Sequence, residues 1–201
     1  MKKIIYFLLL VTFSNNLHAQ DSQKIASVKA FVEDVGNKII HTAGEKSLSE
    51  EKKREKIIAI VDQSIDSLWI SRFVLGNNYK TASDSQREKF SDLYRQFMIN
   101  TYGPKFKNYN GRKFTVIKVS EQKGFFVAEA EFLPKDSDVA IDTDFRVKER
   151  DGKLVILDFI AEGISLIETQ RSEFNSAILQ KGMDSFLVDL GTRVDNLKKQ
   201  K

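Results

Sequence analysis

The sequence predicts an α+β fold, in which helices before and after a central block of strands wrap a twisted antiparallel sheet of about four strands. Two observations support this order. Apolar residues recur at steps of three and four over 22–109 and again over 164–198, as on one face of a helix. Over 112–161 apolar and polar residues alternate instead, as in half-buried strands.

The first nineteen residues have the layout of a secretory signal peptide. Lys2 and Lys3 supply the positive start, an apolar run of about ten residues follows, and the segment ends in the small residue Ala19. This run is too short to cross the hydrocarbon core of a membrane, which takes roughly 20 residues. We therefore expect 1–19 to be cleaved on export, and 20–201 to form one domain.

The composition disfavours several kinds of chemistry. Among the 201 residues there is no Cys, which excludes disulfides, thiol nucleophiles and thiolate metal sites. His18 and His41 are the only imidazoles, so neither a metal centre nor a Ser-His-Asp triad is supported. No phosphate-binding loop or nucleophile elbow occurs. We expect no metal, no cofactor and no enzymatic activity.

The charges are not arranged as in a nucleic-acid-binding protein. The chain has 32 Lys and Arg against 28 Asp and Glu, and the two signs are interspersed. A basic cluster occurs only at the C-terminal end, in 198–201, where a solvated tail is the simpler interpretation. No nucleic-acid partner is expected.

The first helical block has recognisable boundaries. Ser47 with Glu50 predicts a capping box at the start of its second helix, and Ser83 with Gln86 predicts another further on. Gly76 is expected to end a helix over 66–75 with a left-handed cap. The aromatic stripe behind Ser83 either fills a core or walls a cavity, and a core is the more common use; it consists of Phe90, Leu93, Tyr94, Phe97, Met98 and Thr101.

Two carboxylates in this block have a spacing that could serve catalysis. Asp62 and Asp66 lie at i and i+4, on one flank of a predicted helix. Such a pair can act as acid and base, but a solvated helix face is the more frequent explanation.

The strand block contains four predicted strands, at 112–120, 125–133, 139–149 and 153–161. On the second strand two small residues, Ala128 and Ala130, stand between Phe126 and Phe132 on one face. Small side chains in the middle of a buried face leave volume, which either a closely packed helix or a ligand groove can occupy. The fourth strand is apolar on both faces except at Asp158, so helices should cover it on both sides.

Several sequence strings resemble one protein family when they are taken in order. They are Phe73-Val74-Leu75-Gly76-Asn77-Asn78-Tyr79-Lys80, Ala82-Ser83 with Gln86-Arg87 and Phe90, Tyr102 with Tyr109-Asn110-Gly111, and Asp158 with Glu162-Gly163-Ile164-Ser165-Leu166 and Arg171-Ser172-Glu173-Phe174. This order is similar to that of MlaC-type proteins, the toluene-tolerance or periplasmic ABC-transporter auxiliary family. The resemblance spans roughly residues 25–195.

The resemblance implies a monomeric carrier in the periplasm of a Gram-negative bacterium. Such a carrier holds the acyl tails of a phospholipid in an apolar cavity enclosed by the sheet and the helices. It is expected to pass lipid between an outer-membrane lipoprotein complex and an inner-membrane ABC transporter complex, and so to maintain outer-membrane lipid asymmetry. Any contact with a membrane is expected to occur through these partners.

The lipid-binding residues are predicted from the faces of the expected elements. The large and small apolar residues that face inward from the sheet and the helices are expected to line the cavity: Leu75, Phe97, Tyr102, Phe126, Ala128, Phe132, Ile141 and Phe145. Arg171 could bind a lipid phosphate at the cavity mouth or pair with Asp158, and pairing is the interpretation that we favour.

Two other functions fit a sheet wrapped by helices around a hollow. One is a small periplasmic enzyme in which Asp158 is a buried general base, a reading that rests on analogy of fold. The other is a chaperone that carries lipidated proteins through the periplasm. Co-purification of phospholipid would distinguish a lipid carrier from both of these alternatives.

Overall fold

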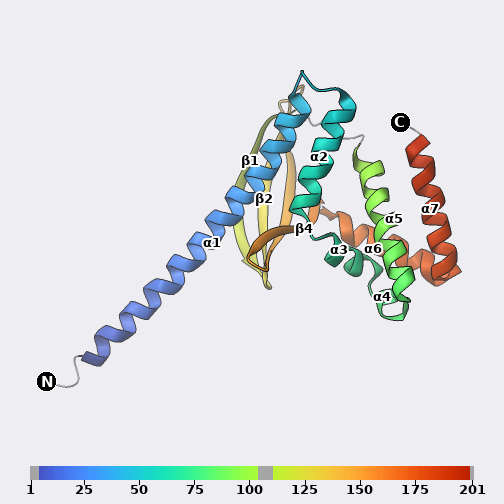
Figure 1. Cartoon of the computed structure of the whole chain (residues 1–201). Helices are drawn as coiled ribbons and strands as arrows, with labels where there is room; N and C mark the ends of the chain where they lie inside the picture. The colour runs from blue at the N-terminus through green and yellow to red at the C-terminus, as the bar shows by residue number, and fades with distance from the viewer. Residues whose placement is uncertain (1–4, 104–110, 200–201) are drawn as a thin grey trace.

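The computed structural model describes residues 5–103 and 111–199, and the side chains of 21–103 and 113–199. Helices precede and follow an antiparallel sheet, which confirms the α+β fold (Figure 1). The elements are α1 (Ile5–Gly44), α2 (Glu50–Ser64), α3 (Ser67–Leu75), α4 (Asn78–Thr81), α5 (Asp84–Tyr102), β1 (Gly111–Gln122), β2 (Phe125–Pro134), β3 (Ile141–Arg150), β4 (Lys153–Ala161), β5 (Ile164–Ser165), α6 (Leu166–Lys181) and α7 (Met183–Lys199).

The first helix is 40 residues long, and its N-terminal half projects away from the rest of the molecule (Figure 1). This half contains most of the predicted signal peptide, of which residues 1–4 lie outside the described part. Within 5–103 and 111–199, no helix combines the length and apolar character that crossing a membrane requires.

Two predicted helix boundaries, the end of α3 at Gly76 and the start of α5 at Ser83, are confirmed, although Gly76 has a φ of 58° and a ψ of −127° and so is not in the left-handed helical conformation. Ser83 and Gln86 form the expected capping box, with backbone-to-side-chain distances of 2.9 and 3.2 Å. The start of α2 is a correction, because its N-cap is Ser49, whose hydroxyl accepts a hydrogen bond from the Lys52 N–H at 3.3 Å. Ser47 lies two residues before this cap, and its backbone N–H and hydroxyl both donate to the Glu45 carboxylate.

The sheet is a meander of five strands in the order β1-β2-β3-β4-β5, with every neighbouring pair antiparallel. The prediction of about four strands missed β5, since two residues are too few to show an alternating pattern. The chain reaches β5 through a tight turn in which Glu162 and Gly163 both have positive φ. The third strand begins at Ile141, so Val139 and Ala140 lie outside it.

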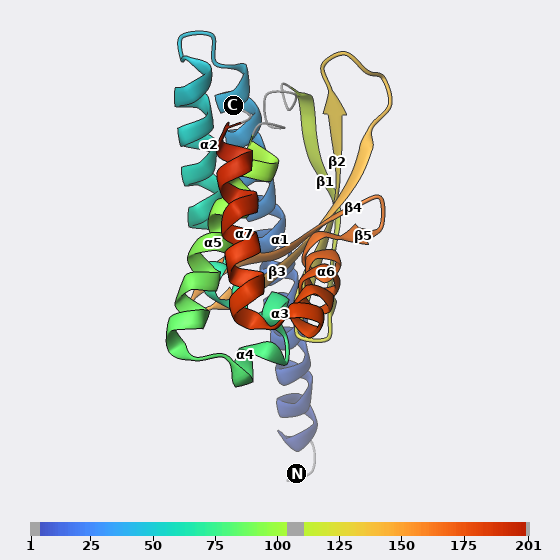
Figure 2. The same ribbon diagram turned by 90° about the vertical axis from the view of Figure 1, so that its right-hand side faces the viewer.

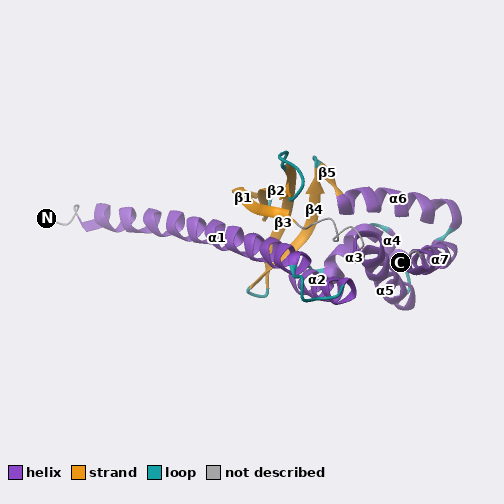
Figure 3. Cartoon of the chain, turned by 90° about the horizontal axis from the view of Figure 1, so that it is seen from above, coloured by secondary structure: helices purple, strands orange, loops and turns teal. Residues whose placement is uncertain are grey.

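Helix α1 crosses one face of the sheet, as Figure 3 shows from above. Val28, Val32 and Val35 of this helix form one buried core with Ala128 and Ala130 on β2. The helix lies so close to β1 that a Cβ at Gly36 would collide with the ring of Phe114. A closely packed helix, and not a groove, therefore occupies the space above the two alanines.

The other helices build a second core beside the sheet. Helices α5 and α7 lie side by side, and α3 packs on α6 (Figure 2). Phe174 of α6 stands at the centre of this helical core, where its ring contacts those of Phe90, Tyr94, Phe97 and Phe186. Because the molecule has two separately packed cores, its interior has a boundary at which they meet.

Candidate functional site

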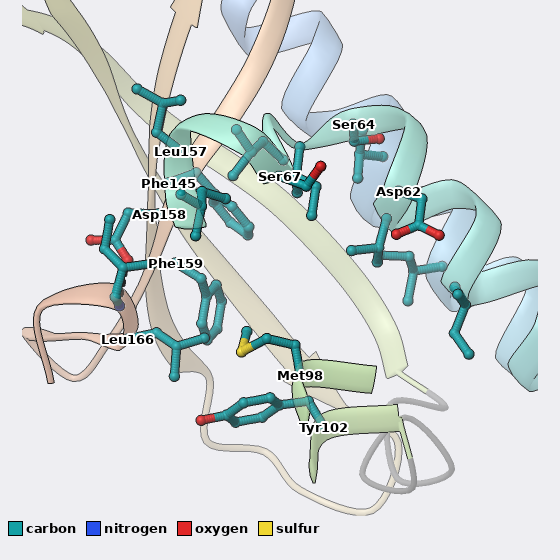
Figure 4. Close-up of a pocket in the computed structure, with 18 of the residues that line it drawn as sticks. Asp62, Ser64, Ser67, Met98, Tyr102, Phe145, Leu157, Asp158, Phe159 and Leu166 are labelled. Atoms are coloured by element: carbon teal, nitrogen blue, oxygen red, sulfur yellow. Dashed lines mark hydrogen bonds between the residues drawn. The ribbon is translucent and has the colours of Figure 1, made fainter. Parts of the chain in front are cut away.

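A cavity of about 280 Å³ lies between the two cores. Its wall is built from α1, α2, α3, α5, the sheet and the first turn of α6, and most of the lining side chains are apolar. In Figure 4, Phe145, Leu157 and Phe159 of the sheet lie on one side of the cavity, and Met98 and Tyr102 of α5 lie on another. The cavity reaches the surface, since Ser67 and Arg95 belong to its wall and are exposed.

Three of the predicted lipid-binding residues line this cavity, namely Tyr102, Phe132 and Phe145. The other five do not belong to its lining among the described residues. Leu75 and Phe97 are buried in the helical core, and Phe126 and Ala128 are buried in the core between the sheet and α1.

Ile141 also lies outside the lining, because it is at the open end of β3 with 40% of its surface exposed. The sequence pattern predicts an inward face for all eight residues, but it does not show which of them reach the cavity and which enter one of the two cores. Whether any of the eight residues binds lipid stays a prediction.

The prediction did not include the wall that α2 contributes. On this helix Ile57 is buried, whereas its neighbours Ile58 and Val61 line the cavity. The signal was present in the sequence, since Ile57, Ile58, Val61 and Ile65 form a stripe broader than one contact needs. A stripe of this width can pack against a core with one edge and face a cavity with the other.

Asp62 and Asp66 do not form an acid–base pair. Asp62 makes an ion pair with Arg95 of α5 at the surface end of the cavity. Asp66 caps α3, accepting a hydrogen bond from the Trp69 N–H at 2.9 Å, and it also pairs with Arg150 of β3. Each carboxylate is used to connect two elements.

Asp158 is the buried carboxylate of the cavity wall, and its side chain is fully buried. It accepts hydrogen bonds from the Ser165 hydroxyl at 2.6 Å, the Arg146 guanidinium at 3.2 Å and the Ile167 N–H at 3.3 Å. Burial raises the pKa of Asp158 above its usual value, although these donors oppose the shift. Because its oxygens bind donors from β3 and the start of α6, Asp158 anchors α6 to the sheet.

Arg171 does not pair with Asp158, so the favoured pairing was wrong. Its guanidinium donates to the carbonyl oxygen of Phe73 at 2.7 Å and stacks 4.7 Å from the centre of that ring. Asn175, one turn further along α6, donates to the carbonyl oxygen of Val74 at 2.8 Å. These two side chains bind carbonyl groups in the last turn of α3, where the Phe73 carbonyl also accepts a hydrogen bond from the Gly76 N–H at 3.1 Å. Arg171 is absent from the described cavity wall.

Replacing Arg171 with Ala is expected to lower the free energy of unfolding by about 1.5–3 kcal/mol, the usual contribution of a hydrogen bond to a charged group. Urea unfolding measures this loss. Lys181→Ala is the matched control, because Lys181 is on the same helix and pairs with Asp189 in solvent, where such a pair contributes about 0–1 kcal/mol. Equal stability of the two variants would contradict the capping role.

Comparison with known families identifies the chain. The model of the family described as MlaC protein matches residues 12–192. The chain belongs to the MlaC family. A curated MlaC relative, the intermembrane phospholipid transport system binding protein MlaC of Haemophilus influenzae, is 22% identical over 121 residues. The match covers 58% of this chain and 56% of the relative, so it spans little more than half of that protein.

A solved structure has the same fold as this MlaC-family chain. It is the phospholipid-binding protein from Ralstonia solanacearum in complex with a phospholipid, and it superimposes with a TM-score of 0.70. The match covers 85% of this chain and 98% of the other, at 19% sequence identity. At this identity the likeness establishes the MlaC-type fold.

Proposed function

We propose that this MlaC-family chain is a periplasmic phospholipid carrier. The acyl tails occupy the cavity between the two cores, and the head group stays at its mouth. The carrier takes lipid from one membrane complex and delivers it to another, between an outer-membrane lipoprotein complex and an inner-membrane ABC transporter complex. This traffic maintains the lipid asymmetry of the outer membrane.

The observation that carries the proposal is the apolar cavity with its opening to the surface. A volume of about 280 Å³ is just below the roughly 300–1,000 Å³ that ligand pockets usually have. A space of this size and character suits hydrocarbon chain and leaves a charged head group outside.

The energetics of lipid transfer explain why an enclosed site is needed. Two acyl chains of roughly 15 methylenes each, at about 0.8 kcal/mol per methylene, lose about 24 kcal/mol on entering water. An exposed apolar groove of matching area would promote aggregation. A carrier must therefore move the tails from one apolar enclosure directly to another.

The relatives support the same function. The Haemophilus influenzae protein is named as the binding protein of an intermembrane phospholipid transport system, and the Ralstonia solanacearum structure contains a phospholipid. The predicted signal peptide at 1–19 agrees with a function outside the cytoplasm.

Native mass spectrometry tests the proposal directly. The chain is produced with its own leader in a Gram-negative host, purified from the periplasm without detergent, and sprayed under non-denaturing conditions. We expect a protein peak carrying the added mass of phospholipid, and renewed uptake from phospholipid vesicles after delipidation. A protein that emerges free of lipid and takes none up from vesicles would overturn the proposal.

A further inference from the structure

An ion pair lies at the mouth of the cavity. Asp62 of α2 and Arg95 of α5 both belong to the lining, with 30% and 50% of their side chains exposed. The Arg95 Nε donates to Asp62 Oδ1 at 3.3 Å, and its Nη2 donates to Oδ2. The guanidinium therefore meets the carboxylate through two nitrogens, in the arrangement that it also uses for phosphate.

Asp62 and Arg95 are the charged lining residues whose contact a ligand can replace. Among the described lining residues, Arg95 is the only Lys or Arg, and Asp62 and Asp158 are the only acids. Asp158 is buried and bound by three donors that hold α6 on the sheet. Asp62 and Arg95 are partly exposed and join two helices that are not packed closely against each other.

Opening the pair costs little. A solvent-exposed ion pair contributes about 0–1 kcal/mol, because water screens the charges and both side chains lose freedom when they meet. A ligand that supplies each partner with a new opposite charge can therefore displace the contact. A ligand that supplies only one such charge leaves the other residue beside an apolar wall without its counter-ion.

We propose that Asp62 and Arg95 select phospholipids with zwitterionic head groups that carry an ammonium. The lipid phosphate replaces the Asp62 carboxylate on Arg95, and the head-group ammonium replaces the Arg95 guanidinium at Asp62. One ion pair is exchanged for two, and the net charge at the mouth does not change. The inference rests on the proposed carrier function and names the lipid class that the same cavity takes.

Asp62 supplies the discrimination against anionic lipids. Phosphatidylglycerol also offers a phosphate to Arg95, but its uncharged glycerol leaves Asp62 facing the phosphate with a like charge. Such repulsion excludes a competitor even where the attraction to Arg95 is the same. The wild-type preference is thus expected to depend on the acid more than on the arginine.

A competition experiment tests this selection. Delipidated protein is incubated with vesicles of equimolar phosphatidylethanolamine and phosphatidylglycerol, reisolated, and its bound lipids are quantified by mass spectrometry. We expect phosphatidylethanolamine to be enriched by about fivefold, which corresponds to roughly 1 kcal/mol. Asp62→Asn should remove the enrichment or reverse it in favour of phosphatidylglycerol.

The control variant removes one negative charge, as Asp62→Asn does, but at a position away from the cavity mouth. Asp92→Asn is on α5, is exposed and is not part of the cavity wall, so it should keep the wild-type ratio. Wild-type protein that takes both lipids equally, or an Asp62→Asn variant with an unchanged ratio, would overturn the selection while leaving the carrier function in place. Protein that takes up neither lipid would instead contradict the carrier function itself.

Discussion

Val61→Trp is expected to lower the phospholipid bound to the purified protein by about tenfold or more, equivalent to about 1.4 kcal/mol or more of binding free energy. Val61 is half-buried on α2, and its side chain forms part of the cavity wall. An indole at this position occupies space that the acyl chain needs. Phospholipid extracted from the protein and quantified per mole of chain gives the result.

The matched control is Ala59→Trp, which adds the same ring to the same helix. Ala59 is exposed and is absent from the described cavity wall, so this variant should retain lipid at the wild-type level. Ile58, which also lines the cavity, gives a second test position if overpacking at 61 destabilises the fold. If the variants at 58, 59 and 61 all bind as much lipid as the wild type, the cavity is not the binding site.

Arg146→Ala is expected to lower the free energy of unfolding at pH 7 by about 3–5 kcal/mol, the loss found when one partner of a buried ion pair is removed. Arg146 donates to Asp158, whose side chain is fully buried, and to Glu168 of α6 at 2.6 Å. Without the guanidinium, Asp158 remains buried with a full charge but without its counter-ion. Urea unfolding at pH 7 measures the loss.

The loss of stability in Arg146→Ala should depend on pH. Burial raises the pKa of folded Asp158 above its usual value of 3.8, so its ionisation weakens the fold. This penalty is absent below about pH 3.8 and grows as the pH rises through the folded pKa. Arg146 opposes the shift, and its removal raises the pKa further.

The stability lost by Arg146→Ala should therefore be larger at pH 7 than at pH 4. Lys118→Ala is the control, since Lys118 makes an exposed ion pair with Glu129 on the same sheet and should lose about 0–1 kcal/mol at either pH. A loss for Arg146→Ala that is the same at both pH values would mean that the charge of Asp158 is not the cause.

The parts of the fold that depend on local chemistry could be predicted from the sequence. The capping box at Ser83 and Gln86 and the end of α3 at Gly76 are set by residues within a few positions of each other, and both are found where expected. The start of α2 shows the limit of such reasoning. Ser47 and Ser49 both suit an N-cap by residue type, and the helix begins directly after the second of them.

The lining of the cavity was harder to predict, because the cavity lies where the helical core meets the core between the sheet and α1. Phe132 and Phe145 face it while Phe126 and Ala128, on the same inward face of the sheet, lie under α1. Alternation along a strand gives the face but not the helix that covers it. The prediction for Arg171 was wrong for a similar reason, because a local pattern does not reveal a distant partner. The partner of Arg171 is a backbone carbonyl of α3, about a hundred residues earlier in the chain.

Photo-crosslinking from the acyl chain tests most directly whether lipid tails occupy the cavity. The protein is loaded with a phospholipid that carries a diazirine on its acyl chain, irradiated, and digested, and the label is located by peptide mass spectrometry. We predict label on the peptides of α2, α5 and β4 that contain cavity residues such as Val61, Met98 and Leu157. Label confined to exposed apolar residues of α6 and α7, such as Leu179 and Val188, would contradict the account.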